Sequence, residues 1–328
     1  MMPKFIMMVG LPGSGKSTWA KEYAKTSENE TVILSSNTIR EELFGFRGVN
    51  TQTSENHEKV FTTMFHRAKT ALAEGKNVVY DATNLKKKNR IHVLRGLQFI
   101  QCQKICQLLI LPYDECLRRN RERDDVVPEE VIWRMYTGFQ PPHGSEGWDY
   151  ISVEVFYGSN ELRKQYSFND TFVEKMESFE QNNPHHQFTL GEHQIRTQAN
   201  LYKWGVTDAE LLMAALFHDI GKMKTRITDE HGVCHYYQHH CVGAYDIFLL
   251  YWGICTPRSL INVSNYIYYH MHPFLAWSQS EQAKEKDKKL LGEEMFEKIM
   301  MLHRADIASQ KERSEEYGAN RETVSGIS

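Results

Sequence analysis

Short apolar runs alternate with amphipathic stretches along roughly the first half of the chain. The apolar runs predict strands at residues 5–9, 32–34, 78–81, 105–111 and 152–156. The stretches between them repeat apolar residues at helical spacing and predict helices at residues 16–25, 38–44, 54–74, 86–100, 113–123 and 129–138. This alternation is typical of an α/β domain, a parallel sheet with flanking crossover helices. Residues 139–149, rich in Pro and Gly, predict a loop near its end.

After about residue 158 the strand pattern ends and helical patterns follow. Residues 158–184 predict a polar connector with one short helix at 170–179. The segments Thr189–Glu192 and Thr207–Glu210 fit the capping box, which predicts helix starts at 190 and 208. Further helices are predicted at residues 239–252, 257–270 and 281–317.

The length of the chain favours more than one domain. Its 328 residues exceed the roughly 150 that an average domain contains. We therefore expect an α/β domain over residues 1–157, a connector over 158–177 and an all-α domain over 178–328.

Composition excludes several classes of protein. Apolar residues make up 41% and charged residues 25%, which is globular usage rather than that of a disordered chain. The net charge of −3 excludes a globally basic nucleic-acid binder, although not a local basic groove. The apolar runs are far shorter than the ~20 residues of a membrane span, so no membrane partner is expected. The six cysteines form no CxxC pair and predict reduced thiols in the cytoplasm.

The segment Gly10–Ser17 matches the phosphate-binding loop GxxxxGK[ST], with a predicted strand before it and a helix after it. Its glycines let backbone N–H groups approach phosphate oxygens, and the helix N-terminus adds a positive dipole. Lys16 would reach the β- and γ-phosphates, and the Ser17 hydroxyl would hold Mg²⁺. We expect ATP, or another nucleoside triphosphate such as GTP, to bind at Gly13, Ser14, Gly15, Lys16, Ser17 and Thr18.

Two further features suit phosphoryl transfer. Asp81 ends the third predicted strand, where a carboxylate can position Mg²⁺ or simply cap the next turn. Arg119 and Arg123 lie four residues apart on one predicted helix and can close over the nucleotide as a lid. The alternative for such an arginine-rich helix is a solvated face.

Four segments resemble, in order and spacing, the kinase domain of polynucleotide 5′-hydroxyl kinases, P-loop enzymes of phage and bacterial RNA end-healing systems. They are GLPGSGKSTWA, SSNTIREELFG, YDATNLKKKNR and LRRNRERDDVVPEEVIWRMY. The resemblance implies a catalytic Lys16, a lid that contains Arg123, and an Arg40 that contacts the acceptor-side phosphate. It also implies that Thr83 and Asn84 line the acceptor side.

Asn37 departs from this family's pattern. The family carries Asp three residues before Arg40, as general base for the attacking hydroxyl, and Asn cannot accept that proton. Loss of a positioned base typically costs 10²–10⁴-fold in rate, although a loose transition state depends less on early deprotonation. Three interpretations stay open: a substitution introduced to trap a complex, a weak natural kinase, or a domain that only binds nucleotide.

Many of the 15 histidines lie after residue 185. The His218–Asp219 pair ends an apolar predicted helix, His193 lies in the helix predicted to begin at 190, and Asp306 follows an apolar helical pattern. Imidazole and carboxylate together suit a transition metal such as Mn, Ni, Co, Fe or Zn. A lone histidine near an apolar helix is more often a packed core residue, so the ordered set carries the prediction.

That set resembles the HD-domain metal phosphohydrolases. The segments HDIGK, HHCVGA and LHRAD carry the resemblance. The resemblance implies one metal bound by His193, His218, Asp219 and Asp306. It implies that His239 and His270 hold a second metal or contact the phosphate, with His240 and His272 as neighbouring alternatives. Lys222 and Arg196 would stabilise charge on phosphate oxygens, and the connector residues His185 and His186 could approach the site.

A kinase joined to a phosphohydrolase suggests RNA end healing. When RNA is cleaved by a metal-independent reaction, one broken end carries a 5′-hydroxyl and the other carries a 2′,3′-cyclic phosphate. A ligase needs a 5′-phosphate and a 3′-hydroxyl at these ends. RNA or DNA ends would be the substrate, and a separate RNA ligase a partner. The basic stretches Lys86–Arg90 and Arg118–Arg123 could track the strand. A mononucleotide kinase with a nucleotidase, or an ATP sensor that regulates the hydrolase, stays open.

Overall fold

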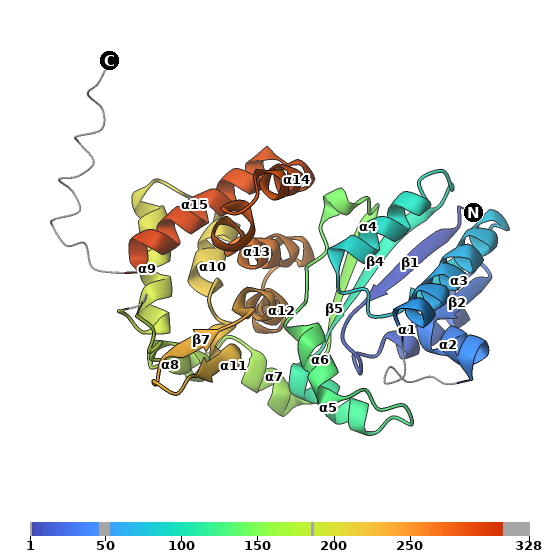
Figure 1. The fold of residues 1–328 in the computed structure, drawn as a ribbon, viewed down its shortest axis with the longest axis horizontal. Coiled ribbons are helices and arrows are strands. Elements are labelled where there is room, and N and C mark those ends of the chain that lie inside the picture. The colour runs from blue at the N-terminus through green and yellow to red at the C-terminus, as the bar shows by residue number, and fades with distance from the viewer. Residues whose placement is uncertain (1, 46–52, 185–186, 311–328) are drawn as a thin grey trace, which may run out of the picture.

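The computed structural model describes residues 2–45, 53–184 and 187–310. The predicted positions His185 and His186, and the part of the predicted last helix beyond residue 310, lie outside these ranges. Figure 1 shows a sheet with its helices beside a second, mostly helical part, and the N-terminus lies in the part that contains the sheet.

The first part is built around a five-stranded sheet in the order β2-β3-β1-β4-β5, with every pairing parallel. All five predicted strands are confirmed within two residues at each end. Their bounds are β1 Lys4–Val9, β2 Thr31–Ser35, β3 Asn77–Asp81, β4 Gln103–Ile110 and β5 Tyr150–Val155.

Alternation along β1 shows how the sheet is covered. Phe5 and Met7 point to one face, where residues of α3 pack, whereas Ile6 and Met8 point to the other face with Ala20 of α1. Both faces are therefore dry, as a parallel sheet requires. The helices of this part are α1 Lys16–Thr26, α2 Ser36–Phe44, α3 Ser54–Ala73, α4 Lys87–Gly96, α5 Tyr113–Arg121 and α6 Glu129–Tyr136, with the 3₁₀ turn η1 Gly144–Glu146.

The segment after residue 158 is more structured than predicted. Two short helices occupy it, α7 (Asn160–Tyr166) and α8 (Asp170–Glu177), because Ser159 and Asn169 each cap a helix start with a side-chain oxygen. The sequence predicted one helix in this segment, at residues 170–179, whereas the structure has two.

The remaining part is mainly helical but not all-α. A two-stranded antiparallel hairpin, β6 (Arg226–Thr228) with β7 (Cys234–Tyr236), corrects that prediction. Three-residue strands carry too few alternating positions to stand out in a sequence. The helices are α9 Leu190–Lys203, α10 Ala209–Phe217, α11 Lys222–Thr225, α12 His239–Tyr251, α13 Pro257–Tyr269, the π-helical turn η2 Pro273–Trp277, α14 Glu281–Leu291 and α15 Glu293–Ser309.

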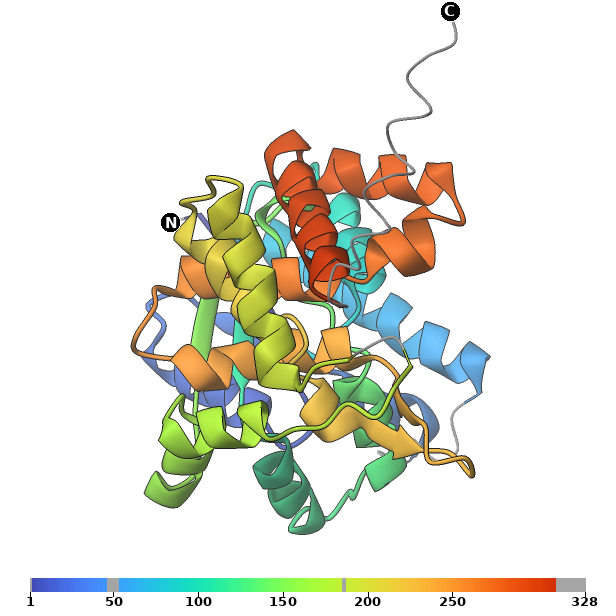
Figure 2. The ribbon, with the colours of Figure 1, turned by 90° about the vertical axis from the view of Figure 1, so that its left-hand side faces the viewer.

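The two parts share one continuous apolar core. Figures 1 and 2 show the helical part beside the part that contains the sheet. The Tyr245 hydroxyl of α12 donates to the Leu111 carbonyl at 2.8 Å and accepts from the Leu111 N–H at 3.1 Å. Tyr136 of α6 donates to Asp246 of α12 at 2.6 Å. In the part of the chain that is described, no helix is both long and apolar enough to cross a membrane.

Candidate functional sites

The loop between β1 and α1 has the backbone conformation that its glycines allow. Gly13 and Gly15 have φ of 80° and 92°, in the left-handed region that side chains disfavour. A Cβ on Gly13 would also lie 2.6 Å from the Cys116 carbonyl oxygen. Helix α1 begins directly after Gly15, so its positive N-terminus faces the cavity beside the loop.

That cavity, the nucleotide pocket, has a volume of about 590 Å³. The predicted residues Gly13, Gly15, Lys16, Ser17 and Thr18 line it, whereas Ser14 is buried beneath the loop. Its other walls come from α2, α3, the end of β3 and the α5–α6 region, and include Asn37, Arg40, His57, Phe61, Asp81, Thr83, Arg119, Arg123, Val127, Val131, Arg134 and Met135.

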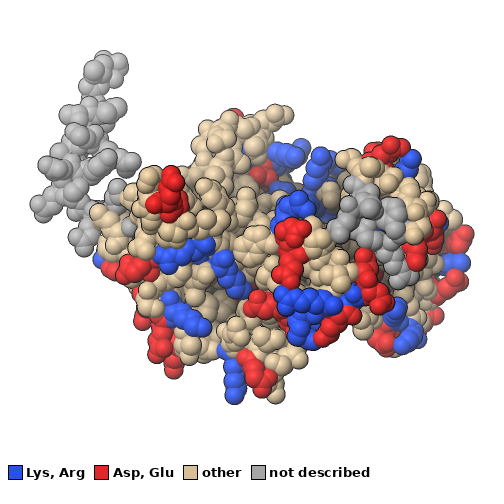
Figure 3. Space-filling model, turned by 60° about the horizontal axis from the view of Figure 1, so that its bottom comes forward, with Lys and Arg blue, Asp and Glu red and all other residues tan. Residues whose placement is uncertain are grey.

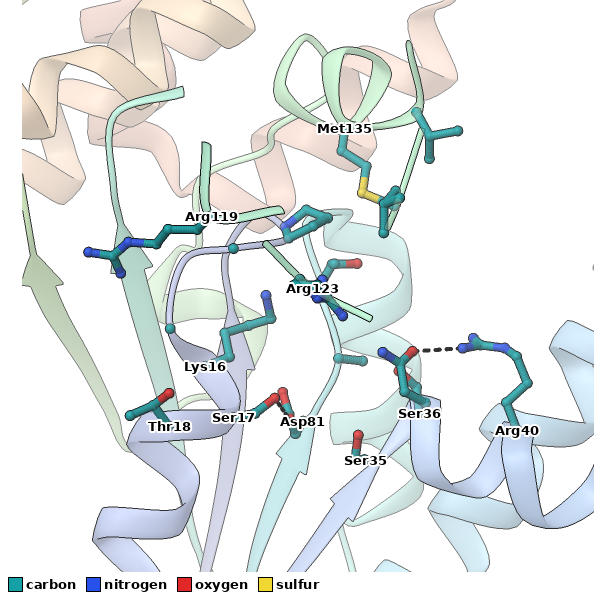
Figure 4. Close-up of a pocket in the computed structure, with 18 of the residues that line it drawn as sticks. Lys16, Ser17, Thr18, Ser35, Ser36, Arg40, Asp81, Arg119, Arg123 and Met135 are labelled. Atoms are coloured by element: carbon teal, nitrogen blue, oxygen red, sulfur yellow. Dashed lines mark hydrogen bonds between the residues drawn. The ribbon is translucent and has the colours of Figure 1, made fainter. Parts of the chain in front are cut away.

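Lys16 is held at the base of the pocket (Figure 4). Its ammonium donates to the carbonyls of Gly10 at 3.1 Å and Leu11 at 2.7 Å. Burial lowers the pKa of Lys16 to about 8, although the Asp81 carboxylate nearby opposes that shift. Burial makes the charged form of a lysine unfavourable, so an anionic phosphate that enters the pocket would stabilise that charged form.

Ser17 and Asp81, the residues predicted to hold Mg²⁺, lie side by side. The Ser17 hydroxyl donates to Asp81 Oδ2 at 2.7 Å, and both side chains point into the pocket (Figure 4). A hydroxyl and a carboxylate beside a phosphate cradle are oxygen donors of the kind Mg²⁺ prefers.

The two lid arginines do not share one helix face. Helix α5 ends at Arg121, so Arg123 lies in the following turn, where its N–H donates to the Asn120 carbonyl at 3.2 Å. The Arg119 guanidinium donates to Glu115 at 2.7 Å. Both still line the pocket, together with Arg134 of α6, which the sequence did not single out.

Asn37 and Arg40 of α2 line the same pocket. Arg40 donates to Asn37 Oδ1 at 2.7 Å, marked by a dashed line in Figure 4. Thr83 lines the same pocket. Asn84 lines a neighbouring groove instead, and its amide donates to the Met8 carbonyl at 2.8 Å, which ties β3 to β1.

Much of the predicted basic surface is engaged in the fold. Arg90 is fully buried and donates to both carboxylate oxygens of Glu146, at 2.8 and 2.6 Å. Lys87 pairs with Asp287 at 2.9 Å, between the two parts. Arg118 and Arg121 pair with acidic neighbours on α5 and α6. Lys/Arg and Asp/Glu are interspersed on the face seen in Figure 3, as the nearly balanced charge suggests.

The second candidate site gathers six histidine and aspartate side chains, all buried. They form two triads whose ligand atoms lie within 4.8 Å of one another: His193, His218 and Asp306, and Asp219, His239 and His270. They come from three helices, α9, α12 and α15, and from the turns that follow α10 and α13, and the fold brings them to one point.

Asp219 joins the two triads. Its Oδ2 lies 3.4 Å from the Nε2 atoms of both His193 and His218. Its Oδ1 lies 3.0 Å from His239 Nε2 and 3.5 Å from His270 Nε2. One carboxylate oxygen therefore faces each triad, which is the arrangement for a bridging ligand between two cations.

Backbone carbonyls orient the imidazoles. The Nδ1 atoms of His218, His239 and His270 lie 2.8, 2.7 and 2.6 Å from carbonyls of Ala215, Tyr236 and Ile267. Donation from Nδ1 to these carbonyls leaves each Nε2 as a lone pair directed at the cluster. Such outer contacts typically fix the tautomer of a metal-binding histidine.

The charges of the cluster favour a cation. Burial alone would lower the pKa of His193, but bonds to Asp219 and Asp306 raise it to about 9. Burial raises the pKa of each carboxyl, yet nearby cationic and donor groups hold both well below the usual range. Two ionised carboxylates among imidazoles fit a pair of divalent transition-metal ions.

The two residues predicted to stabilise charge on the phosphate lie in different surroundings. Lys222 is buried and donates to Asp219 Oδ2 at 2.6 Å and to Gln181 at 2.8 Å. Arg196 pairs with Glu192 at 2.8 Å and stacks on Phe188 at 3.8 Å, and neither partner belongs to the triads.

Two polar residues of this site were not predicted from the sequence. Gln181 contacts Lys222, and the Ser309 hydroxyl lies 3.1 Å from His193 Nδ1. Neither belongs to a motif, and only the fold brings them to the cluster. His240 and His272, the neighbouring alternatives, belong to neither triad.

The first part of the chain is similar to known proteins. Residues 5–142 match the family described as an AAA domain. The chain is 28% identical over 154 residues to L-seryl-tRNA(Sec) kinase of Methanococcus maripaludis, which covers 46% of this chain and 58% of that protein. It is 29% identical over 175 residues to human heterogeneous nuclear ribonucleoprotein U-like protein 2, covering 49% of this chain and 22% of that protein. The chain thus spans less than two thirds of the length of either relative.

Among solved structures, a chain of the Pnkp1/Rnl/Hen1 RNA repair complex is similar at 24% identity and a TM-score of 0.36, covering 42% of this chain and 44% of that chain. Kti12 of Chaetomium thermophilum, solved with ADP-AlF₃, has 18% identity and a TM-score of 0.38, covering 49% and 94%. The family match and the kinase relative show that the first part is similar to P-loop domains, those of kinases among them. The HD family of the helical part stays a prediction.

Proposed function

We propose that this chain repairs both ends of a broken RNA. The P-loop domain phosphorylates the 5′-hydroxyl with ATP, and the helical domain removes a 2′,3′-cyclic phosphate or 3′-phosphate. The observation that carries the proposal is the six-residue cluster joined by Asp219, in the same chain as a separate phosphate cradle. The relative named for seryl-tRNA supports an acceptor hydroxyl carried by RNA.

At the P-loop site, the 5′-hydroxyl oxygen attacks the γ-phosphorus as the bond from that phosphorus to the bridging oxygen of the β-phosphate breaks. ADP leaves with that oxygen, and the proton of the hydroxyl passes to solvent. Lys16 neutralises charge on the β- and γ-phosphates, and Arg123 stabilises the transferred group. Arg40 holds the acceptor-side phosphate, and Mg²⁺ would be held by Ser17, with Asp81 beside it.

At the helical site, two transition-metal ions would be held by the triads, with Asp219 between them. Such ions supply a bound water of near-neutral pKa and polarise the phosphoester. The imidazoles of His218, His239 and His270, held by backbone carbonyls, would offer their Nε2 atoms to these ions. Lys222, held by Gln181, neutralises charge beside the phosphate.

The test uses one RNA with a 5′-hydroxyl and a 2′,3′-cyclic phosphate, given ATP and Mg²⁺ with Mn²⁺, Ni²⁺, Co²⁺, Fe²⁺ or Zn²⁺. We expect both ends to be converted. Lys16→Ala should lose only 5′-phosphorylation, and Asp219→Asn only 3′-end processing, so each variant controls for the other. Conversion of mononucleotides in preference to RNA would instead favour a mononucleotide kinase with a nucleotidase.

A second candidate rests on Asn37. With an amide in place of the general base, the P-loop domain would bind ATP without transferring phosphate and would regulate the hydrolase. ATP binding with no labelled RNA product, and a phosphatase rate that changes with ATP, would select this reading. The free thiols of all six cysteines support a reducing compartment, and we propose the cytoplasm, with a separate RNA ligase as the partner that seals the ends.

A further inference from the structure

A second hollow adjoins the nucleotide pocket, between α3 and α4. We call it the α3–α4 groove. Its volume is about 460 Å³, within the range of small-molecule sites. Its lining consists of His57, Glu58, Phe61, Thr62, Phe65, Tyr80, Asn84, Lys88, Asn89, His92 and Val93.

Aromatic rings form much of the groove wall. Phe61 and Phe65 of α3 are half-buried and lie one helical turn apart. Phe65 packs against Gly96 so closely that a Cβ on that glycine would collide with its ring. The His57 ring lies 4.6 Å from the Phe61 ring, centroid to centroid. The groove therefore offers fixed aromatic surface at one edge of a polar cavity.

The rim carries groups that suit a phosphodiester. Lys88 and His92 are exposed on α4, and Asn89 lies between them. Burial and the nearby Arg40 lower the pKa of His57, which favours its neutral ring. Glu58 is the acidic residue of the lining.

The groove continues the acceptor side of the nucleotide pocket. His57 and Phe61 line both cavities, and Arg40 and Thr83 are among the other residues that line the nucleotide pocket. A strand whose 5′ end lies in the pocket can therefore extend into the groove without leaving the surface.

We propose that the α3–α4 groove binds the second nucleotide of a single-stranded acceptor, counted from its 5′-hydroxyl end. The base stacks against Phe61 and Phe65, and Lys88 and His92 face the phosphodiester. This proposal rests on the proposed kinase function and adds a requirement for a polynucleotide acceptor. Stacking on aromatic side chains with basic groups along the backbone is the general mode of sequence-tolerant single-strand binding.

The test compares two 5′-hydroxyl acceptors, a nucleoside 3′-monophosphate and a trinucleotide. We expect wild-type KM to be about tenfold lower for the trinucleotide, since one stacked base typically contributes that much or more. Phe65→Leu, which keeps apolar volume, and Lys88→Ala should each shrink the ratio of the two KM values toward one. Arg95→Ala removes an exposed charge from the same helix outside the groove and should leave the ratio unchanged.

The outcomes distinguish a failure of the groove proposal from a failure of the proposed kinase function. Phosphorylation of neither acceptor overturns the kinase function itself. Equal KM values for both acceptors, or a ratio that Phe65→Leu and Lys88→Ala leave intact, overturn the groove proposal while the kinase stands.

Discussion

Under the proposed kinase function, Asn37 stands where a general base would take the proton of the attacking hydroxyl. Its Oδ1 accepts from Arg40 at 2.7 Å, as a carboxylate in its place would also do. We predict that Asn37→Asp raises turnover for a 5′-hydroxyl oligonucleotide by about 10²-fold or more, because a positioned base becomes available. The measurement is transfer of labelled γ-phosphate. Asn37→Ala should bring no such gain, and an unchanged rate for the Asp variant would argue against the acceptor role of this position.

The ammonium of Lys16 makes nucleotide binding depend on pH. Its pKa of about 8 in the free protein lies below the ordinary 10.5, and phosphate oxygens favour the charged form. Binding above pH 8 must therefore take up a proton, so affinity should fall about tenfold between about pH 7 and pH 9. Titration with a fluorescent ATP analogue checks this, and Lys16→Arg should remove most of the decrease. A wild-type affinity that is flat over this range would contradict the assignment.

At the scale of elements, Gly221 packs closely against the start of α12, which carries His239 of the second triad. It lies in the turn between α10 and α11, where a Cβ would collide with the His239 carbonyl. We predict that Gly221→Ala pushes α12 away and lowers stability by about 1–3 kcal/mol or more. Bound metal per chain, measured by elemental analysis, should fall with it.

Gly144→Ala is the matched control, because open space surrounds that position. It should keep both stability and metal content. If Gly221→Ala also kept them, the packing of the turn against α12 would not be what aligns the two triads.

Long elements with strong periodicity could be predicted from the sequence, and short or interrupted ones could not. The sheet strands and Thr189, which caps α9 as predicted, follow from local patterns. At the next helix the cap is Asp208 rather than Thr207, since both residues can fill that role. The predicted helix 281–317 breaks at Gly292, whose φ of 82° ends α14. Family likeness predicted that residues far apart in sequence, such as His193 and Asp306, lie together, and the structure brings them together. Gln181 and Ser309 belong to no motif, so only the fold places them beside the cluster.

At the scale of the whole molecule, the two parts are joined by a buried interface. The Tyr245 hydroxyl bonds both backbone groups of Leu111 across it, and the core is continuous through it. We predict one cooperative thermal transition. Tyr245→Phe should lower the free energy of unfolding by about 1–3 kcal/mol, because it leaves a buried N–H and carbonyl without their partner.

Tyr202→Phe provides the comparison, since that tyrosine is 58% exposed. It should change the free energy of unfolding by less than about 0.5 kcal/mol. Two separate transitions in the wild-type protein would show that the parts fold independently and that the interface contributes little.

Anomalous diffraction from crystals grown with Mn²⁺ and ADP tests most directly whether this chain holds a phosphohydrolase centre separate from its nucleotide cradle. We predict two strong peaks, one in each triad, with one oxygen of Asp219 on each, and ADP phosphates at Lys16 well apart from them. Absence of metal density between His193, His218 and Asp306, at full occupancy of the ADP site, would contradict the account.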